Sequence, residues 1–400
     1  MVIIHAVIHT MEEHLPLIAD GYLRFEQRRI TDLGTMQDYQ PQDNEPVFDA
    51  EGRHLYPGFV DAHTHLGLFG DSLTFEGDDG NEDTDPITPQ LRAIDAINPL
   101  DGYFAEALAA GITTAVTGPG SANPIAGQMA AIKTYGKRID NMIVQAPVGM
   151  KFALGENPKS TYNDKDQTPV TRMATAALIR ETLTKAQRYY REQCRYEQDS
   201  DNEDEPEPDM KLAALLPLFR HEMPAHFHVH RADDIFTAVR IAKEFDLDYV
   251  LVHATEGHLV TEELTEELSD KHLRGILSGP ILTDRSKPEL HHQSPKAPGI
   301  LSAAGIPTAI ITDHPETPLP YLLLCAAVAV REGMDREAAL RAVTIVPARI
   351  CGIDQQVGSL AVGKDADIVV YDGDPLDMTQ RPVAVFINGR QVKSAICDNV

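Results

Sequence analysis

Hydrophobic and polar residues alternate with a period of two near both ends of the chain. Short apolar runs of this kind, separated by polar turns, lie at residues 2–9, 21–25 and 29–32, and again at 367–371, 383–387 and 390–393. The alternation predicts half-buried strands, and Asn388-Gly389 between the last two runs is a strong signal for a two-residue hairpin. We therefore expect the two termini to share one small β-sandwich domain, formed by residues 1–57 and 356–400.

Between the ends, continuous apolar runs alternate with segments of helical periodicity. Strand-like runs lie at 113–117, 142–148, 226–230, 249–253 and 308–312, and helical stretches at 99–110, 171–192, 233–245, 261–269, 319–332 and 335–343. Such α/β alternation over about 290 residues is typical of a (β/α)8 TIM barrel, which we place at residues 58–355. A doubly wound sheet is the competing fold, but no glycine-rich phosphate loop follows an early strand.

Charge and cysteine content narrow the classes of partner. The 400 residues include 35 Lys and Arg against 61 Asp and Glu, a formal net charge of −26. This charge repels phosphate backbones and anionic lipid, so we expect neither a nucleic-acid nor a membrane partner. The four cysteines are far apart in the sequence and suggest neither a disulfide framework nor a thiolate zinc site. We expect a cytoplasmic protein that acts on a small-molecule substrate, and the sequence leaves a homo-oligomer open.

Histidines follow the strand-like runs. His63 and His65 end a hydrophobic run, and because alternate residues of a strand point to the same side, the two imidazoles should converge. Later strand-like runs lead to further candidate ligands: His228, His230, His253 and Asp313. In a barrel all of these strand ends open on one face. Imidazoles together with a carboxylate suit Zn²⁺ or another divalent metal, and we expect one or two ions.

These residues, in this order, resemble those of the amidohydrolase superfamily. The resemblance spans nearly the whole chain and rests on the Pro-Gly-x-Val-Asp-x-His63-x-His65 strand, on His228, His253 and Asp313, and on the carboxy-terminal sequence VGSLAVGKDADIVVYDGDP. Within the superfamily, the chain is similar to the imidazolonepropionase-related, prolidase-like branch. The resemblance implies a metal-dependent hydrolase with a (β/α)8 barrel and a β-sandwich built from both termini. It also implies that these histidines and Asp313 are metal ligands.

One further ligand is expected between residues 149 and 158. Many members of the superfamily bridge two metals with a carboxylated lysine, and others use a glutamate; this segment contains Lys151 and Glu156. We favour Glu156, which stands where the apolar run ends and an Asn-Pro turn begins, and keep Lys151, placed deeper, as the alternative. His228 is favoured over His230 because the family's ligand is the first of such a pair. That leaves His230 to contact the substrate.

Other candidate substrate-binding residues are Asn123, Gln128 and Arg231. Asn123 and Gln128 follow an early strand, where they either line the mouth of the pocket or form a structural turn. Arg231 comes directly after the second histidine pair, and its planar guanidinium matches a substrate carboxylate. The alternative for Arg231 is a salt bridge to a nearby acidic residue such as Asp233. Relatives also bind substrate on the loop that corresponds to residues 283–287.

The expected reaction is hydrolysis of an amide or peptide C–N bond. A bound divalent ion lowers the pKa of water and supplies hydroxide at ordinary pH. Asp313 would take up the proton and pass it to the leaving nitrogen, while His253 or His230 would donate a hydrogen bond to the developing oxyanion. A dipeptide or N-acyl amino acid would fit Arg231.

Two alternatives remain from the sequence. The first is an imidazolonepropionase-like cyclic amidase or a deaminase. Members that act on rings resemble one another in having a glutamate three residues after the strand histidine, whereas this chain has Arg231 there. The second is a metal-free scaffold that has lost catalysis, and the retention of the histidines and Asp313 argues against it.

Overall fold

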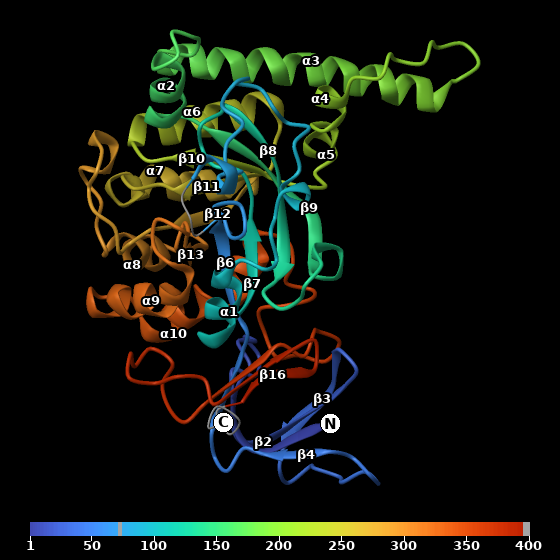
Figure 1. Ribbon diagram of the computed structural model, residues 1–400, viewed down its shortest axis with the longest axis vertical. Coiled ribbons are helices and arrows are strands. Elements are labelled where there is room, and N and C mark those ends of the chain that lie inside the picture. Colours follow the sequence, from blue (N-terminus) through green and yellow to red (C-terminus); the bar gives the residue numbers. More distant parts are fainter. Residues whose placement is uncertain (71–73, 395–400) are drawn as a thin grey trace.

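Two eight-stranded sheets organise the molecule. The computed structural model describes residues 1–70 and 74–394, so Cys397 and the end of the expected terminal domain, 395–400, lie outside the described residues. Figure 1 shows the sheet formed by the two termini as a separate body beneath a sheet that is covered by helices.

The first sheet is built from both ends of the chain. Its strands are β1 (Val2–His9), β2 (Leu17–Glu26), β3 (Arg29–Thr35), β4 (Val47–Asp49), β5 (His54–Pro57), β14 (Ile368–Tyr371), β15 (Ala384–Ile387) and β16 (Arg390–Ser394). Their order is β16-β15-β14-β5-β1-β2-β3, with β4 beside β1, so β14 and β5 join the C-terminal strands to the N-terminal ones. Apolar side chains such as Ile3, Leu23 and Phe386 form its core. The expectation of one β-rich unit built from both termini is confirmed.

The Asn388-Gly389 turn connects β15 to β16, as the sequence predicts. Both residues have positive φ, 51° and 71°, which suits the tight turn of an antiparallel hairpin. A Cβ at position 389 would lie 2.0 Å from the Gln27 carbonyl oxygen, so only glycine fits there.

The second sheet is a nearly closed barrel. Its strands follow each other in chain order: β6 (Phe59–Thr64), β7 (Ile112–Thr117), β8 (Ile125–Lys133), β9 (Ile143–Ala153), β10 (Ala225–Val229), β11 (Tyr249–His253), β12 (Leu273–Ser278) and β13 (Thr308–Ile310). The Asp313 N–H, after β13, donates to the His63 carbonyl oxygen in β6 at 3.2 Å and so brings the last strand back to the first. The predicted α/β barrel class is confirmed.

One part of the barrel departs from regular β/α alternation. Strand β8 pairs antiparallel with both β7 and β9, while the other neighbours are parallel. No helical stripe separates residues 117 and 143, so the chain forms a meander at this point. Gln128, expected at the mouth of the pocket, lies within β8.

Helices cover the outside of the barrel. They are α1 (Gly102–Ala109), α2 (Glu156–Asn163), α3 (Arg172–Gln198), α4 (Met210–Ala213), α5 (Leu216–Phe219), α6 (Ala232–Phe245), α7 (Thr261–Glu266), α8 (Ala297–Ala303), α9 (Leu322–Arg331), α10 (Arg336–Arg341) and α11 (Ile345–Ile350). Helix α6 buries an apolar stripe against β10 and β11, as its periodicity predicts. Asp335 caps α10 by accepting a hydrogen bond from the Ala338 N–H. Within the described residues, no helix is both long and apolar enough to cross a bilayer.

The barrel and the terminal sheet are joined by a buried ion pair. The Lys133 ammonium at the end of β8 lies 2.6 Å from Asp367 Oδ2 and 3.0 Å from Asp365 Oδ2, and all three side chains are nearly inaccessible. Because an unpaired buried charge is strongly destabilising, this contact fixes how the C-terminal segment docks on the barrel.

Candidate functional site

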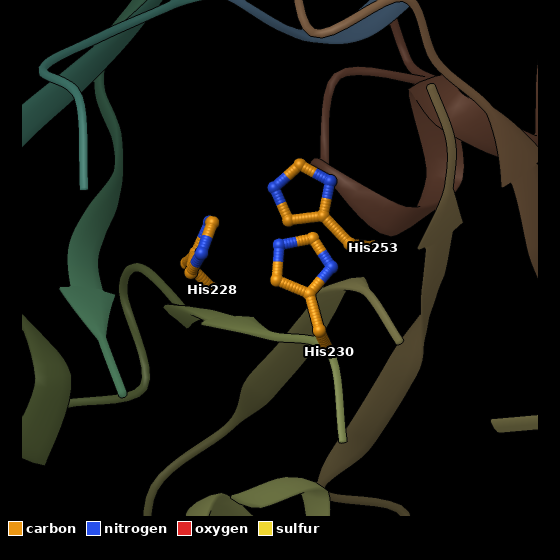
Figure 2. Close-up of side chains that lie close together, drawn as sticks. All are labelled: His228, His230 and His253. Carbon is orange, nitrogen blue, oxygen red and sulfur yellow. The ribbon is translucent and has the colours of Figure 1, made fainter. Parts of the chain in front are cut away.

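The strand-end histidines and Asp313 meet at the carboxyl end of the barrel. His63 lies in β6 with His65 just after it, His228 lies in β10 with His230 just after it, His253 ends β11, and Asp313 follows β13. Their ligand atoms form two groups, each within 4.8 Å: His63, His65 and Asp313 in one, and His228, His230 and His253 in the other. Figure 2 shows the three rings of the second group lying close together.

The first group aims two imidazoles at one carboxylate oxygen. Nε2 of His63 and Nε2 of His65 each lie 3.3 Å from Asp313 Oδ1. The other nitrogen of His65, Nδ1, is 2.7 Å from the Gly118 carbonyl oxygen. Since a carbonyl only accepts, Nδ1 of His65 carries a proton, and this bond fixes the ring with Nε2 directed at the carboxylate.

The second group repeats this arrangement. Nδ1 of His253 donates to the Gly279 carbonyl oxygen at 2.7 Å, and its Nε2 is buried without a hydrogen-bond partner. Nδ1 of His228 is 2.9 Å from the Ser121 hydroxyl, and Nδ1 of His230 is 2.7 Å from the Thr255 hydroxyl. Metal-binding histidines usually have the ring nitrogen away from the metal fixed in this way.

The electrostatics favour neutral imidazoles beside a charged carboxylate. Burial, followed by neighbouring imidazoles or Lys151, holds the pKa values of His63, His228 and His230 well below the usual histidine value, and burial lowers that of His253 to about 4. Burial alone would raise the pKa of Asp313, but the imidazoles that face it hold its pKa well below the usual value.

This donor set fits a divalent cation. Nε2 of His63 and Nε2 of His65 converge on one carboxylate oxygen, and the buried Nε2 of His253 has no hydrogen-bond partner. Imidazole nitrogens with a carboxylate oxygen are ligands that Zn²⁺ and similar ions prefer.

Two of these residues also have unusual backbones. His253 has φ 70° and Asp313 has φ 53°, in the left-handed region that non-glycine residues seldom adopt. Such conformations concentrate at functional sites, where the surrounding structure holds them in place. The Asp61 carboxylate helps to hold the backbone next to Asp313. It is completely buried and accepts hydrogen bonds from the His63 N–H and from the N–H and hydroxyl of Thr312.

Of the two candidates for the further ligand, the structure brings only Lys151 to the centre. Its side chain is completely buried in β9, and Nζ lies 3.1 Å from His63 Nε2. Burial lowers the pKa of Lys151 to about 8, with Asp313 acting in the opposite direction.

Glu156, the residue favoured from the sequence, is in neither ligand group. Strand β9 ends at Ala153, and Gly155, at φ 79°, turns the chain so that Glu156 becomes the first residue of α2. Its backbone N–H donates to Glu289 Oε2 at 2.9 Å. The turn at Gly155 separates Glu156 from the end of β9, whereas the sequence placed this residue at the strand mouth.

Three of the four expected substrate-binding residues lie away from the cavity at the centre. Arg231 is about half exposed and pairs with Asp233 at 3.1 Å, the alternative that the sequence left open. The Asn123 amide donates to Glu82 and Thr88 and accepts from Tyr162, so it holds loops together. Gln128 borders a separate small hollow, whereas His230 does line the cavity.

The cavity itself has a volume of about 430 Å³ and reaches both ligand groups. Its wall includes Lys287, which lies on the loop after β12, together with Asn157 and Ser121. Lys287 Nζ lies 2.7 Å from Asn157 Oδ1 and 2.7 Å from Glu289 Oε1. The sequence pointed to the 283–287 loop but did not single out Lys287, and it gave no sign of the buried Glu289 beside it.

Comparison with known proteins agrees with this geometry. The sequence pattern that defines the amidohydrolase family matches residues 54–399. The amidohydrolase tasK from Hapsidospora irregularis is 32% identical over 363 residues, which cover 86% of this chain and 37% of that protein. The chain therefore spans little more than a third of that relative's length.

Solved structures show the same architecture. An amidohydrolase from Thermotoga maritima MSB8 superposes with a TM-score of 0.91 at 36% identity, covering 98% of this chain and 99% of that one. A prolidase complexed with N-methylphosphonate-L-proline has a TM-score of 0.57 at 16% identity over 98% and 99% of the two chains, a likeness of fold alone. The family match covers most of the chain, and the protein thus belongs to the amidohydrolase family.

Proposed function

We propose that the chain is a divalent-metal-dependent hydrolase that cleaves the amide or peptide bond of an open-chain substrate bearing a carboxylate. A dipeptide or an N-acyl amino acid has this chemistry. The observation that carries the proposal is the convergence of five imidazoles and Asp313 beside one cavity, with the far ring nitrogens of His65 and His253 bonded to backbone carbonyls.

The residues divide naturally between two ions. His63, His65 and Asp313 would hold one, and His228 and His253 the other, while Lys151, as its carbamate, would bridge them in place of Glu156. A buried amine whose pKa is lowered to about 8 is in part neutral near neutral pH, and only the neutral amine reacts with carbon dioxide. When bound, such ions lower the pKa of a coordinated water and polarise the scissile carbonyl.

Asp313 would move the proton during hydrolysis. Its carboxylate is 14% exposed and faces both ligand groups, with Oδ1 toward His63 and His65 and Oδ2 3.9 Å from His253 Nε2. It can take a proton from the attacking water and deliver it to the leaving nitrogen, because both would lie within its reach. His230 lines the cavity beside it and would contact the substrate carbonyl oxygen.

Lys287 replaces Arg231 as the residue that recognises the carboxylate. Among the described residues that line the cavity, it is the only lysine or arginine. Its Nζ donates to Asn157 Oδ1 and forms an ion pair with Glu289 Oε1. Since an ammonium has three N–H donors, Lys287 would also donate to an anionic group of the substrate.

The reaction class is tested by comparing substrates on the zinc-loaded enzyme. We expect turnover of dipeptides and N-acyl amino acids, because the cavity combines a proton-transfer group with a cation. Initial rates would be measured by release of the free amine. Turnover confined to cyclic amides or to ring amines would contradict the proposal and favour the cyclic amidase or deaminase alternative.

Carboxylate recognition is tested by Lys287→Met. We expect kcat/KM for an N-acyl amino acid to fall about 10- to 100-fold, since a hydrogen bond to a charged group contributes about 1.5–3 kcal/mol. For the corresponding methyl amide the loss should be much smaller, because that substrate has no carboxylate to lose contact with.

Arg231→Met is the matched control for this experiment, because Arg231 is a cation that also follows a barrel strand but pairs with Asp233 and does not line the cavity. It should leave the ratio of the two kcat/KM values unchanged. An equal loss on both substrates in Lys287→Met, or discrimination in Arg231→Met, would show that Lys287 does not bind the carboxylate.

A further inference from the structure

A second histidine cluster lies at the opposite end of the barrel. His221 precedes β10, Asp248 immediately precedes β11, and His272 immediately precedes β12. These are the amino ends of the strands whose carboxyl ends hold His228 and His253. Asp248 and His253 are five positions apart along β11, which at about 3.3 Å per residue is roughly 16 Å. The cluster is therefore separate from the site described above.

The cluster offers the ligand atoms of a metal site. One nitrogen of each imidazole and one oxygen of Asp248 lie within 4.8 Å of one another. Nδ1 of His221 is 3.4 Å, and Nδ1 of His272 is 3.1 Å, from the same atom, Asp248 Oδ1. The two rings are tilted by 32° with their centroids 5.9 Å apart, so both present nitrogen to a common point.

Supporting contacts hold the carboxylate in place. Arg274 Nη2 donates to Asp248 Oδ2 at 2.8 Å, which leaves Oδ1 directed at the imidazoles. The Asp248 carbonyl accepts from the Ala225 N–H, and the His272 carbonyl accepts from the Tyr249 N–H, so both residues are anchored to the barrel strands. Although burial would raise the pKa of Asp248, hydrogen bonds from Arg274 and His272 keep it below the usual value, and the group is charged at neutral pH.

Asp246 adds a further negative charge at the rim, on the Nε2 side of both rings. It ends α6 with φ 56°, and its carboxylate lies 3.3 Å from Nε2 of His272 and 3.8 Å from Nε2 of His221. With Arg274 included and the imidazoles neutral, the group has a net charge of −1, which attracts a cation. The side chains of His221 and His272 are 41% and 30% exposed, so an ion can reach them from solvent.

We propose that His221, Asp248 and His272 bind a transition-metal ion, Zn²⁺ or Cu²⁺, at the amino-terminal face of the barrel. A site of two imidazoles and a carboxylate favours these ions over Mg²⁺ or Ca²⁺. The ion links the segments that precede three successive strands, and an ion that binds only the folded state stabilises it. In TIM barrels this face serves stability, and catalysis takes place at the other.

The test measures zinc bound to the full chain. Wild type, the double variant His221→Ala/His272→Ala and the control His14→Ala are each equilibrated by dialysis against the same micromolar zinc buffer, and the zinc content is measured by mass spectrometry. His14 is a suitable control because its side chain is 80% exposed and stands apart from both histidine clusters.

Wild type and His14→Ala should hold one zinc per chain more than the double variant, which should keep its hydrolytic activity. Equal zinc content in all three proteins would overturn the proposal. Copper added to the metal-free wild-type chain and double variant gives a second readout. The wild-type electron paramagnetic resonance spectrum should contain a component with splitting from two nitrogen ligands that the double variant lacks, and identical spectra would equally overturn the site.

Discussion

Replacing Lys151 with alanine is expected to lower kcat/KM by on the order of 10³-fold, because the bridge between the two proposed ions is lost and metal-derived stabilisation of several kcal/mol goes with it. Nζ of Lys151 lies 3.1 Å from His63 Nε2, and the side chain is completely buried. Short carboxylic acids such as formate or acetate should restore part of the activity, since they supply the missing carboxylate in the space that the side chain leaves. Rates with and without each acid provide the measurement.

Glu156→Ala is the matched control for this experiment. Glu156 belongs to neither ligand group, so the variant should retain near-normal activity and metal content. Loss of activity in Glu156→Ala together with a nearly normal Lys151→Ala would restore the glutamate as the bridging ligand. A Lys151→Ala enzyme that stays inactive with every acid, despite correct folding, would contradict the carbamate.

The double variant His63→Ala/His65→Ala is expected to have the largest effect of all, with amide hydrolysis reduced to the uncatalysed background. The two imidazoles converge on Asp313 Oδ1, so their removal takes away two ligands of one proposed ion and leaves the carboxylate without its partners. Initial rates at saturating zinc would measure the loss. His5→Ala/His14→Ala, which removes two exposed histidines outside this centre, should keep full activity.

Much of the fold follows from periodicity that is visible in the sequence. The alternation of apolar runs and amphipathic stretches predicts the barrel, and the Asn388-Gly389 signal predicts the last hairpin of the terminal sheet. The sequence does not predict the antiparallel strand β8 because Ile125–Lys133 is almost wholly buried, so it shows neither the alternation of a half-buried strand nor the stripe of a helix. Long-range pairing with β7 and β9 decides its structure.

For the candidate site, the sequence predicts what the strands determine and misses what the turns determine. His63, His65, His228, His253 and Asp313 lie on or beside strands, and barrel topology alone brings strand ends together.

Glu156 and Arg231 depend instead on local geometry. Gly155 reverses the chain before Glu156, and Asp233, two residues after Arg231, is close enough to pair with its guanidinium. Lys287 is positioned by Asn157, which is distant in the sequence, and by Glu289, which is two residues away but belongs to no recognisable motif.

Metal content of the His63→Ala/His65→Ala variant tests the central claim most directly. Wild type and the variant would be purified without added chelator and equilibrated with the same zinc buffer. Their zinc content would then be measured by mass spectrometry. The proposed centre predicts that the variant holds at least one zinc per chain fewer than wild type, while circular dichroism shows the same fold. Unchanged zinc content in a correctly folded variant would contradict the assignment of a metal centre to these strand ends.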